Sequence, residues 1–299
     1  MGQELDRRVF LKKSIQTGIA AFSIGVSGRF YCKHVEPFWV ETKAYKINIP
    51  SIPPAFHKLR IVQFSDTHLG FHFNLLQLTK MIDKINKLQP DLILFTGDLL
   101  DKPAQYKNKE ALAIVEVLSK IKAAHGKFCC YGNHDHGHNG SSLYKEVMEA
   151  SDFIVLRNSN RMLRAANGQS IYIAGIDEPM IGRPLWDKTL ENIPDNQFVL
   201  LLSHAPDLAH QAKNLRVDMQ LSGHSHGGQI QLPFIGPIFT PPFAKDFSDG
   251  LYNAGRMIVY VNKGLGTTRI PYRFLARPEL TLFVLESGQL GDQKVQNNK

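Results

Sequence analysis

Cysteine is scarce in this chain, which excludes the small folds that are held together by disulfides. Only Cys32, Cys129 and Cys130 occur among 299 residues, and so low and odd a count does not make a disulfide framework. Cys129 and Cys130 are adjacent in an apolar run. Neighbours in a strand point to opposite faces, so these two are not expected to bond to each other. We predict that both are small buried residues rather than ligands or nucleophiles.

Dense runs of charge are also missing. The formal net charge is +8, from 35 Lys and Arg against 27 Asp and Glu, but the basic residues are scattered. Nucleic-acid-binding arms and patches concentrate their basic residues, so no specific nucleic-acid partner is expected. The positive balance favours anionic partners such as phosphorylated substrates, anionic polymers or acidic membrane surfaces. A scatter of solvated lysines is the alternative explanation of the same charge.

No apolar run reaches the ~20 residues that a membrane-spanning helix needs. A shorter one, from Ile15 to Val26, follows a basic segment that contains Arg7, Arg8 and then Val-Phe-Leu-Lys. This order is typical of an export signal, although an ordinary amphipathic helix is the alternative. The arginine pair with Phe-Leu-Lys behind it resembles the twin-arginine signal, whose partner is the twin-arginine export machinery. We expect residues 1–30 to direct the protein to the cell wall or the outer face of the cytoplasmic membrane. The segment is either cleaved near Gly28 or kept as an anchor.

The rest of the chain has the pattern of an α/β domain. Apolar strands are predicted at 59–64, 92–95 and 128–131, with helices at 75–88 and 109–124 between them. Such strands suit a parallel sheet that is covered on both faces. After a short helix at 142–150, strands are expected at 153–156, 171–176, 198–203, 219–222, 257–262 and 280–285. They predict a second sheet stacked on the first. We expect a linker and edge strand at 31–58, one domain at 59–287 and a polar tail at 288–299.

Polar side chains that suit a metal follow the predicted strand ends. The motifs, in order, are Asp66-Thr67-His68, Gly97-Asp98, Gly132-Asn133-His134-Asp135, Ser203-His204 and Gly223-His224-Ser225-His226. Carboxylates, imidazoles and amide oxygens are ligands of borderline and hard divalent metals. Open α/β sheets place their sites at the carboxyl ends of strands. Any one of these residues alone would more often be an ordinary polar group, but the ordered set predicts a metal site.

The spacing within the motifs has a physical reason. In extended backbone, residues i and i+2 face the same side, so Asp66 with His68, and His224 with His226, are expected to reach one cavity. A glycine precedes Asp98, Asn133 and His224, which permits a sharp exit from the strand and a close approach of the backbone.

Taken in order, the motifs resemble those of the calcineurin-like metallophosphoesterases: Asp-x-His, Gly-Asp, Gly-Asn-His-Asp/Glu, a single His, then Gly-His-x-His. The resemblance covers about residues 59–285. Segments 223–230, 262–266 and 277–282 are similar to those of a bacterial branch of this family with exported members. It implies a four-layer αββα sandwich, in which two stacked mixed β-sheets are flanked by helices. Ser225 stands where Thr is common, a change not expected to affect the ligands.

The resemblance also implies two divalent metal ions and a role for each motif. One ion would be held by Asp66, His68, Asp98 and His226, and the other by Asp98, Asn133, His204 and His224. A hydroxide that bridges the ions would attack phosphorus, and His134 would act on the leaving oxygen. Asp135 would either orient His134 or hold a turn. Oxygen and nitrogen ligands without thiolate suit Mn²⁺, Zn²⁺ or Fe, and the bridging carboxylate and the amide favour Mn²⁺.

The expected protein is an exported monomeric enzyme that hydrolyses phosphodiester or phosphomonoester bonds. Cleavage of a pyrophosphate in a lipid-linked or UDP-activated sugar, of the UDP-2,3-diacylglucosamine type, is an alternative. An alternative of another class is a catalytically silent protein that binds cell-wall polymer, although the intact ligand set and His134 argue against it.

Substrate-binding residues are not identified by the sequence. Segment 232–244 is either an apolar wall beside the metals or, as we favour, a loop packed at the edge of the sandwich. Arg269, Arg273 and Arg277 either contact phosphate or lie on the surface. His136 and His138 are expected to face solvent.

Overall fold

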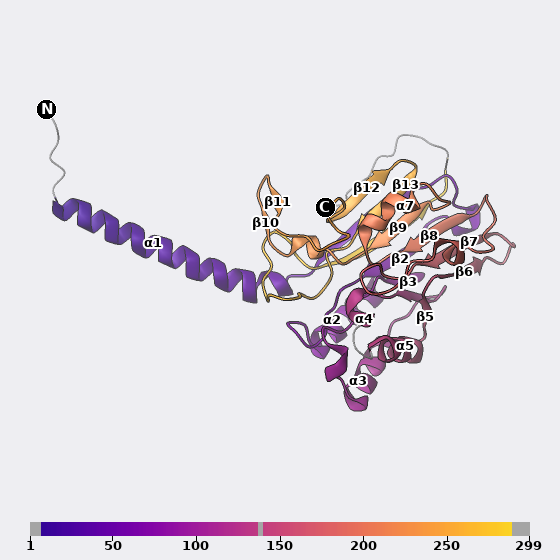
Figure 1. The fold of residues 1–299 in the computed structure, drawn as a ribbon, viewed down its shortest axis with the longest axis horizontal. Helices are drawn as coiled ribbons and strands as arrows, with labels where there is room; N and C mark the ends of the chain where they lie inside the picture. The colour runs from indigo at the N-terminus through magenta and orange to yellow at the C-terminus, as the bar shows by residue number, and fades with distance from the viewer. Residues whose placement is uncertain (1–6, 137–139, 289–299) are drawn as a thin grey trace.

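The computed structural model describes residues 7–136 and 140–288, and Figure 1 shows their arrangement. The predicted four-layer sandwich is confirmed, because two six-stranded sheets stack on each other and helices cover their outer faces. The strand order is β1-β14-β2-β3-β4-β5 in the first sheet and β12-β13-β9-β8-β7-β6 in the second. Both sheets are mixed, since antiparallel pairs occur at β14–β2, β12–β13 and β6–β7 and all other neighbours are parallel.

The first sheet includes two strands that were expected in the second. It contains β1 (Glu41–Asn48), β2 (Leu59–Phe64), β3 (Leu92–Phe95), β4 (Lys127–Cys130), β5 (Phe153–Leu156) and β14 (Glu279–Glu286). The assignment of 153–156 and 280–285 to the second sheet is wrong, because β5 pairs with β4 and β14 pairs with β2. The outer face of the first sheet is covered by α2 (Leu75–Lys87), α3 (Asn108–Leu118) and α5 (Gly140–Ala150). Helix α3 ends before the predicted boundary at 124. Asn86 explains the early end, because its side chain donates to the Lys120 carbonyl and accepts from the Lys122 N–H, which ties this segment to the end of α2.

The second sheet contains two strands that the sequence did not predict. Its members are β6 (Ser159–Arg164), β7 (Ser170–Gly175), β8 (Phe198–Leu202), β9 (Met219–Ser222), β12 (Gly250–Ala254) and β13 (Met257–Val261). The unpredicted β6 and β12 are edge strands with mostly exposed or half-buried side chains, so they lack the apolar run that marks the central strands. Short helices α6 (Trp186–Thr189) and α7 (Ala209–Ala212) pack on the outer side of this sheet.

The remaining elements are short and lie mainly in the connections. They are a ribbon of β10 (Gln231–Leu232) and β11 (Gly236–Pro237), the one-turn helix α4 (Asn133–His136), and 3₁₀ turns at Glu36–Phe38, Pro54–Phe56, Pro103–Gln105, Pro206–Leu208 and His226–Gly228.

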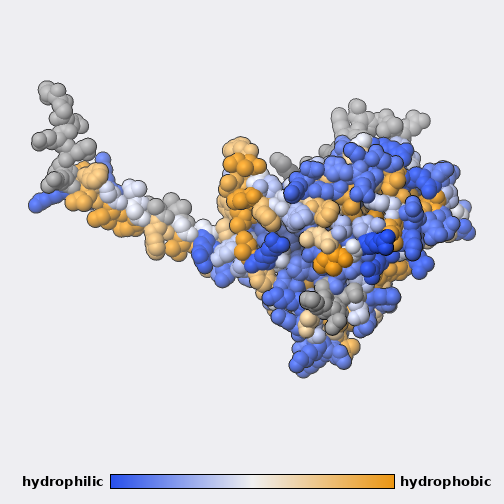
Figure 2. Space-filling model, in the orientation of Figure 1, coloured by the Kyte–Doolittle hydropathy of each residue, from blue (hydrophilic) through white to orange (hydrophobic). Residues whose placement is uncertain are grey.

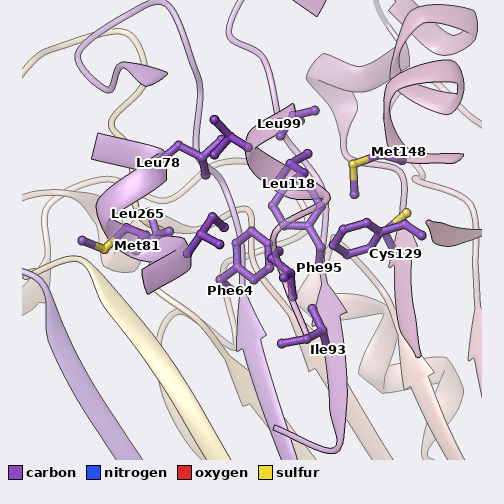
Figure 3. Close-up of a cluster of buried hydrophobic side chains, with 14 of the residues drawn as sticks. Phe64, Leu78, Met81, Ile93, Phe95, Leu99, Leu118, Cys129, Met148 and Leu265 are labelled. Carbon is purple, nitrogen blue, oxygen red and sulfur yellow. The ribbon is translucent and has the colours of Figure 1, made fainter. Parts of the chain in front are cut away.

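Two apolar layers fix the first sheet in place. Figure 3 shows the layer under the helices, where Phe64 and Phe95 pack with ring centroids 4.8 Å apart. The other layer lies between the sheets. Cys129 belongs to the helix side and Cys130 to the layer between the sheets, and both are fully buried. Their predicted burial on opposite faces is therefore confirmed.

Helix α1 (Arg7–His34) projects away from the sandwich (Figure 1). Its last turn is attached to the domain, because the Cys32 carbonyl accepts from the Arg273 N–H at 2.8 Å and the Lys33 carbonyl accepts from His72 Nε2 at 2.9 Å. Among the described residues, no helix has both the length and the apolar character needed to cross a membrane. His138 and nearly all of the predicted tail lie outside the described residues.

Candidate metal centre

The predicted ligands come together where the carboxyl ends of strands from both sheets meet. Asp66 follows β2, Asp98 follows β3 and Asn133 follows β4 in the first sheet. His204 and His224 follow β8 and β9 in the second. The loops that follow these strands therefore bring the ligand residues into one buried cluster.

The predicted extended backbone of the paired motifs is wrong. Asp66, His68, Asp98, His224 and His226 all have positive φ, between 42° and 69°. The pairs share a cavity because each residue sits in a tight left-handed turn. For a residue other than glycine such a conformation costs on the order of 1 kcal/mol and persists only when the surroundings fix it. Here the fixing contacts include Asp66 N–H to the Gly97 carbonyl at 2.9 Å and His224 N–H to Asp66 Oδ1 at 3.1 Å.

Two glycines permit the close approach that the sequence predicts. A Cβ at Gly132 would lie 2.1 Å from Asp98 Oδ1, and a Cβ at Gly223 would lie 2.1 Å from Asp66 Oδ2. No side chain fits at either distance, so any larger residue would displace a carboxylate.

The first group of donors consists of Asp66, His68 and His226, all buried. The Nε2 atoms of His68 and His226 lie 3.1 Å apart, and His226 Nε2 is 3.4 Å from Asp66 Oδ1. Asp98 borders this group, since its Oδ2 is 3.5 Å from His68 Nε2.

The second group consists of Asp98, His204 and His224. His204 Nε2 is 3.1 Å from His224 Nδ1 and 3.3 Å from Asp98 Oδ2. The same Asp98 oxygen therefore lies between the two groups. Asn133 Oδ1 is buried and has no hydrogen-bond partner, which leaves an acceptor at the site that no protein donor satisfies.

Hydrogen bonds on the far side of two rings fix which nitrogen faces the cluster. His204 Nδ1 donates to the Thr96 carbonyl at 2.7 Å, and His224 Nε2 donates to the Pro242 carbonyl at 2.9 Å. A carbonyl can only accept, so in the neutral ring the nitrogen that faces inward is the one with the lone pair. This is the arrangement of metal-ligating histidines. Together with the unpartnered Asn133 oxygen, it fits a binuclear metal site.

The carboxylates and imidazoles of the cluster shift each other's pKa values. Burial alone would raise the pKa of Asp98, but the imidazoles of His204 and His134 lower it well below its usual value. Burial alone would lower the pKa of His204, yet the carboxylates of Asp98 and Asp66 raise it to about 10. The carboxylates thus favour a bound cation, whether this is a proton or a metal.

His134 lies beside the donors and lines the pocket that opens on them. The His134 ring meets that of His68 edge-on, with centroids 4.6 Å apart. The backbone N–H of His134 donates to Asp98 Oδ1 at 2.9 Å. His134 could also approach an ion, because it forms a further group of close donors with His68 and Asp98. Burial would lower the pKa of His134, but Asp98 and the Asp101 carbonyl raise it.

Asp135 holds a turn and does not orient His134. Its carboxylate accepts from the backbone N–H groups of Asp98 at 2.7 Å, Leu99 at 3.0 Å and Gly132 at 2.9 Å. Burial and the charge of Asp98 raise the pKa of Asp135 to about 7, against these N–H groups, which lower it. The His134 ring is oriented instead by the backbone carbonyl of Asp101, which accepts from Nδ1.

Two residues near the cluster were not recognised in their roles. Asp101 Oδ1 lies 3.5 Å from the outward Nδ1 of His68. Arg273 is fully buried, so both predictions for it, a phosphate contact or a surface position, are wrong. Its guanidinium donates to the carbonyls of Ala276 at 2.6 Å and Lys263 at 2.8 Å and lies 3.4 Å from His226 Nδ1. Arginine is rarely buried, so nothing in the sequence indicates this role.

Near the pocket, the structure separates the alternatives left open for two arginines and corrects two expectations, for the loop and for His136. Arg269 lines it and lies over the Phe239 ring, whereas Arg277 stacks on Trp39. The packed loop that we favoured for 232–244 is wrong for residues 232–239, whose apolar side chains are largely exposed. His136 does not face solvent, because its Nε2 lies 2.8 Å from a carboxylate oxygen of Asp177.

Comparison with known proteins agrees with this geometry. A family model described as calcineurin-like phosphoesterase matches residues 59–228. The chain is 45% identical over 286 residues to the uncharacterized metallophosphoesterase YkuE of Bacillus subtilis (strain 168), which covers 95% of this chain and 99% of that protein.

Two further relatives carry names that state an activity. Phosphodiesterase YaeI of Escherichia coli (strain K12) is 29% identical over 293 residues, covering 94% of this chain and 99% of YaeI. UDP-2,3-diacylglucosamine pyrophosphatase LpxG of Chlamydia trachomatis is 28% identical over 308 residues, covering 84% of this chain and 91% of LpxG. With its sandwich fold and its buried Asp and His clusters, the chain belongs to the calcineurin-like phosphoesterases and is a metal-dependent hydrolase of phosphoric esters.

Proposed function

We propose that the protein is an exported, Mn²⁺-dependent phosphoesterase that hydrolyses phosphodiesters or phosphomonoesters outside the cytoplasmic membrane. The observation that carries this proposal is the position of Asp98 Oδ2, between two groups of inward-facing donors and beside His134. Ligands that are all oxygen or nitrogen, with a carboxylate between the two groups, favour Mn²⁺ over Zn²⁺ or Fe.

The first ion would be held by Asp66, His68, Asp98 and His226, and the second by Asp98, Asn133, His204 and His224. When bound, such ions activate water and offset negative charge at a phosphoryl group.

His134 would protonate the leaving group, and Asp101 and Asp135 position the groups around it. The Asp101 carbonyl accepts from His134 Nδ1, which leaves Nε2 as the atom that can give a proton to the leaving oxygen. Asp98 and the Asp101 carbonyl raise the pKa of His134, which favours a proton on its ring. Asp135 holds the peptide N–H of Asp98 and so fixes the carboxylate between the two groups.

Export through the twin-arginine machinery is supported by the motif that begins at Arg7 and continues to Lys12. These residues begin α1, which extends away from the sandwich (Figure 1), so recognition of the motif would not require the domain to unfold. The proposed location is the cell wall or the outer face of the cytoplasmic membrane.

A second candidate function is cleavage of a pyrophosphate in a lipid-linked or UDP-activated sugar. The pocket wall favours it, because Met180, Phe239 and Pro241 line the cavity together with Arg269. A substrate with an apolar group next to its phosphate could contact the apolar side chains and the arginine at once. The relative LpxG is named for a substrate of this kind.

The test is hydrolysis of a chromogenic phosphodiester by the purified full chain, with Mn²⁺ and then with chelator. Activity that needs Mn²⁺, and an Asp98→Asn variant that loses both metal and activity, are the expected results. Asp83→Asn, on the exposed face of α2, is the matched control. A protein that holds no metal, shows no activity and still binds cell-wall material would contradict the enzyme and favour the silent wall-binding alternative.

The natural substrate would come from a screen of the Mn²⁺-loaded enzyme. Wall teichoic acid fragments, nucleotides, UDP-sugars and phospholipids cover the candidate classes. Turnover of UDP-sugars alone would support the pyrophosphate candidate over the general phosphoesterase.

A further inference from the structure

The apolar ribbon, residues 232–239, projects beside the metal centre. Its exposed side chains are Phe234, which is fully exposed, Ile235 at 75%, Ile238 at 61% and Phe239 at 56%. Figure 2 shows a hydrophobic protrusion where Figure 1 draws β10 and β11, next to a largely hydrophilic surface. Single exposed apolar residues are ordinary on a protein surface, but a contiguous protruding set marks an interaction site.

Three segments meet around the base of the ribbon. The Gln231 N–H donates to the Phe274 carbonyl at 2.8 Å, which joins the ribbon to segment 266–278. The Arg273 N–H donates to the Cys32 carbonyl at 2.8 Å, which joins that segment to the end of α1. Arg29 lies over the Tyr272 ring at 5.7 Å and strengthens the second junction.

The charge of these segments has one sign. Segments 26–35, 227–244 and 266–278 contain no Asp or Glu, and their Lys and Arg residues are Arg29, Lys33, Arg269, Arg273 and Arg277. Arg273 is the buried one. Glu36, directly after the first segment, accepts from the Ala276 N–H but is buried, so it adds no exposed negative charge. Ile270 and Leu275, in the same segments, add further exposed apolar surface. The region therefore combines a protruding apolar tip with exposed basic residues in the segments that meet at its base, here called the basic ring.

The ribbon is also coupled to the site. It begins shortly after the last ligand motif, and the Ile238 N–H donates back to the Ile230 carbonyl at 3.0 Å. Phe239, on its returning side, lines the metal pocket with Arg269 over its ring. Whatever the ribbon contacts is held close to the mouth of this pocket.

We propose that the apolar ribbon inserts into the interface of an anionic lipid bilayer. Phe234, Ile235 and Ile238 would enter the boundary between headgroups and acyl chains, which such anchors reach to a depth of ~5–10 Å. Arg29, Lys33, Arg269 and Arg277 would lie at the level of the lipid phosphates, whose negative charge attracts them. The apolar tip and the basic ring match the two layers of such a surface. If the proposed function also holds, this docking presents the metal pocket to phosphoryl groups at the membrane.

The experiment places a fluorophore on the ribbon of the full-length protein. Ile235→Cys, in a Cys32→Ser background, carries an environment-sensitive dye, and Leu112→Cys on α3 carries it as the control. On vesicles that contain phosphatidylglycerol, the dye at 235 is expected to shift to the blue and to be quenched by lipid-attached quenchers, while the dye at 112 is unchanged. Pure phosphatidylcholine vesicles are expected to give a much smaller response, because the basic ring lacks its partner.

Sedimentation with the same vesicles supplies an independent measurement. Phe234→Ser/Ile235→Ser is expected to bind about tenfold or more weakly than the unchanged protein, since two inserted apolar side chains are lost. The control Leu76→Ser/Leu112→Ser removes two exposed leucines from α2 and α3, the helices that cover the first sheet. It is expected to bind normally. Hydrolysis of a soluble chromogenic ester by the ribbon variant checks that the site is intact.

Each contrary outcome identifies what is wrong. Vesicle binding without a shift at 235 would mean that α1 alone attaches the protein, and it overturns the proposal. Equal binding to neutral and anionic vesicles overturns the anionic partner. A shift at 235 that depends on protein concentration and needs no vesicles would assign the ribbon to a second copy of this chain. These measurements need no turnover. An inactive protein would therefore refute the proposed function, while the membrane proposal would still be tested by vesicle binding.

Discussion

The Nδ1 atom of His134 lies 2.7 Å from the backbone carbonyl of Asp101. A carbonyl only accepts, so Nδ1 carries the proton of the neutral ring and Nε2 is the atom left to exchange one. Asp98 and Asp101 lie in the same loop after β3. The Asp101 carboxylate approaches Nδ1 of His68, the nitrogen that points away from the cluster. One loop thus positions both the predicted proton donor and a predicted ligand.

Replacing His134 is expected to remove turnover and leave the metal in place. His134→Ala should lower hydrolysis of a chromogenic phosphodiester by about 10²–10⁴-fold, the usual size of acid–base catalysis. Metal content of the purified protein, measured alongside activity, checks the assignment. The exposed His210→Ala variant, which loses a ring that does not line the pocket, should keep full activity. A fully active His134→Ala protein would show that the leaving group does not need this residue, and loss of one ion would make His134 a ligand.

Asp101→Asn is expected to weaken metal binding. The Asp101 carboxylate faces the nitrogen of His68 that points away from the cluster, and partners in this position typically contribute 10–100-fold in metal affinity or activity. Titration of metal-free protein with Mn²⁺ measures the change, with Asp83→Asn as the surface control. Unchanged affinity would reduce this contact to mere proximity.

Arg273→Ala is expected to destabilise the fold. The variant leaves the carbonyls of Ala276, Lys263 and Gly266 without their buried donor, at about 1–3 kcal/mol for each unsatisfied group. A total of about 3–5 kcal/mol in urea unfolding is expected, against less than about 1 kcal/mol for Arg277→Ala on the surface. If the two variants unfold alike, the buried network contributes little to stability.

Gly223→Ala is expected to disturb the first metal group without unfolding the chain. The added Cβ would lie 2.1 Å from Asp66 Oδ2 and 2.2 Å from Ser65 Oγ, so the carboxylate must move. The expected result is less bound metal with a native circular dichroism spectrum. Gly28→Ala meets nothing within 4 Å and serves as the control. Normal metal content in Gly223→Ala would mean that Asp66 can move without losing an ion.

Asp177 is expected to make stability depend on pH. Burial would raise the pKa of Asp177, but hydrogen bonds from His136, the Arg183 N–H and Arg157 lower it to about 2. Since the unfolded value is ~3.9, the charged form stabilises the fold above pH ~4, and this contribution is lost as the pH falls towards 2.

Urea unfolding of an Asp177→Asn variant checks this dependence. The variant should be less stable than the unchanged protein by about 3 kcal/mol at pH 7, since charged hydrogen bonds are lost, and the gap should narrow below pH ~4. Asp187→Asn, on the exposed side of α6, should show no such gap. A gap that stays constant from pH 7 to pH 3 would contradict the assigned pKa.

The sequence by itself determined the central strands, the order of the motifs and the edge at which they meet. Continuous apolar runs such as Leu92–Phe95 can only be buried on both faces, and parallel strands bring their carboxyl ends together. Ligand types therefore followed from residue types, and the sandwich followed from the resemblance of the motifs to a known family.

Only the tertiary structure decided how each side chain is held. The left-handed turns at Asp66 and His224 depend on hydrogen bonds from distant loops. The burial of Arg273 depends on backbone carbonyls that the fold brings together. The edge strands β6 and β12 form because a neighbour pairs with them, not because their own side chains are apolar. Exposure of the ribbon at Phe234 was equally hidden, since an apolar residue in a sequence does not state whether anything covers it.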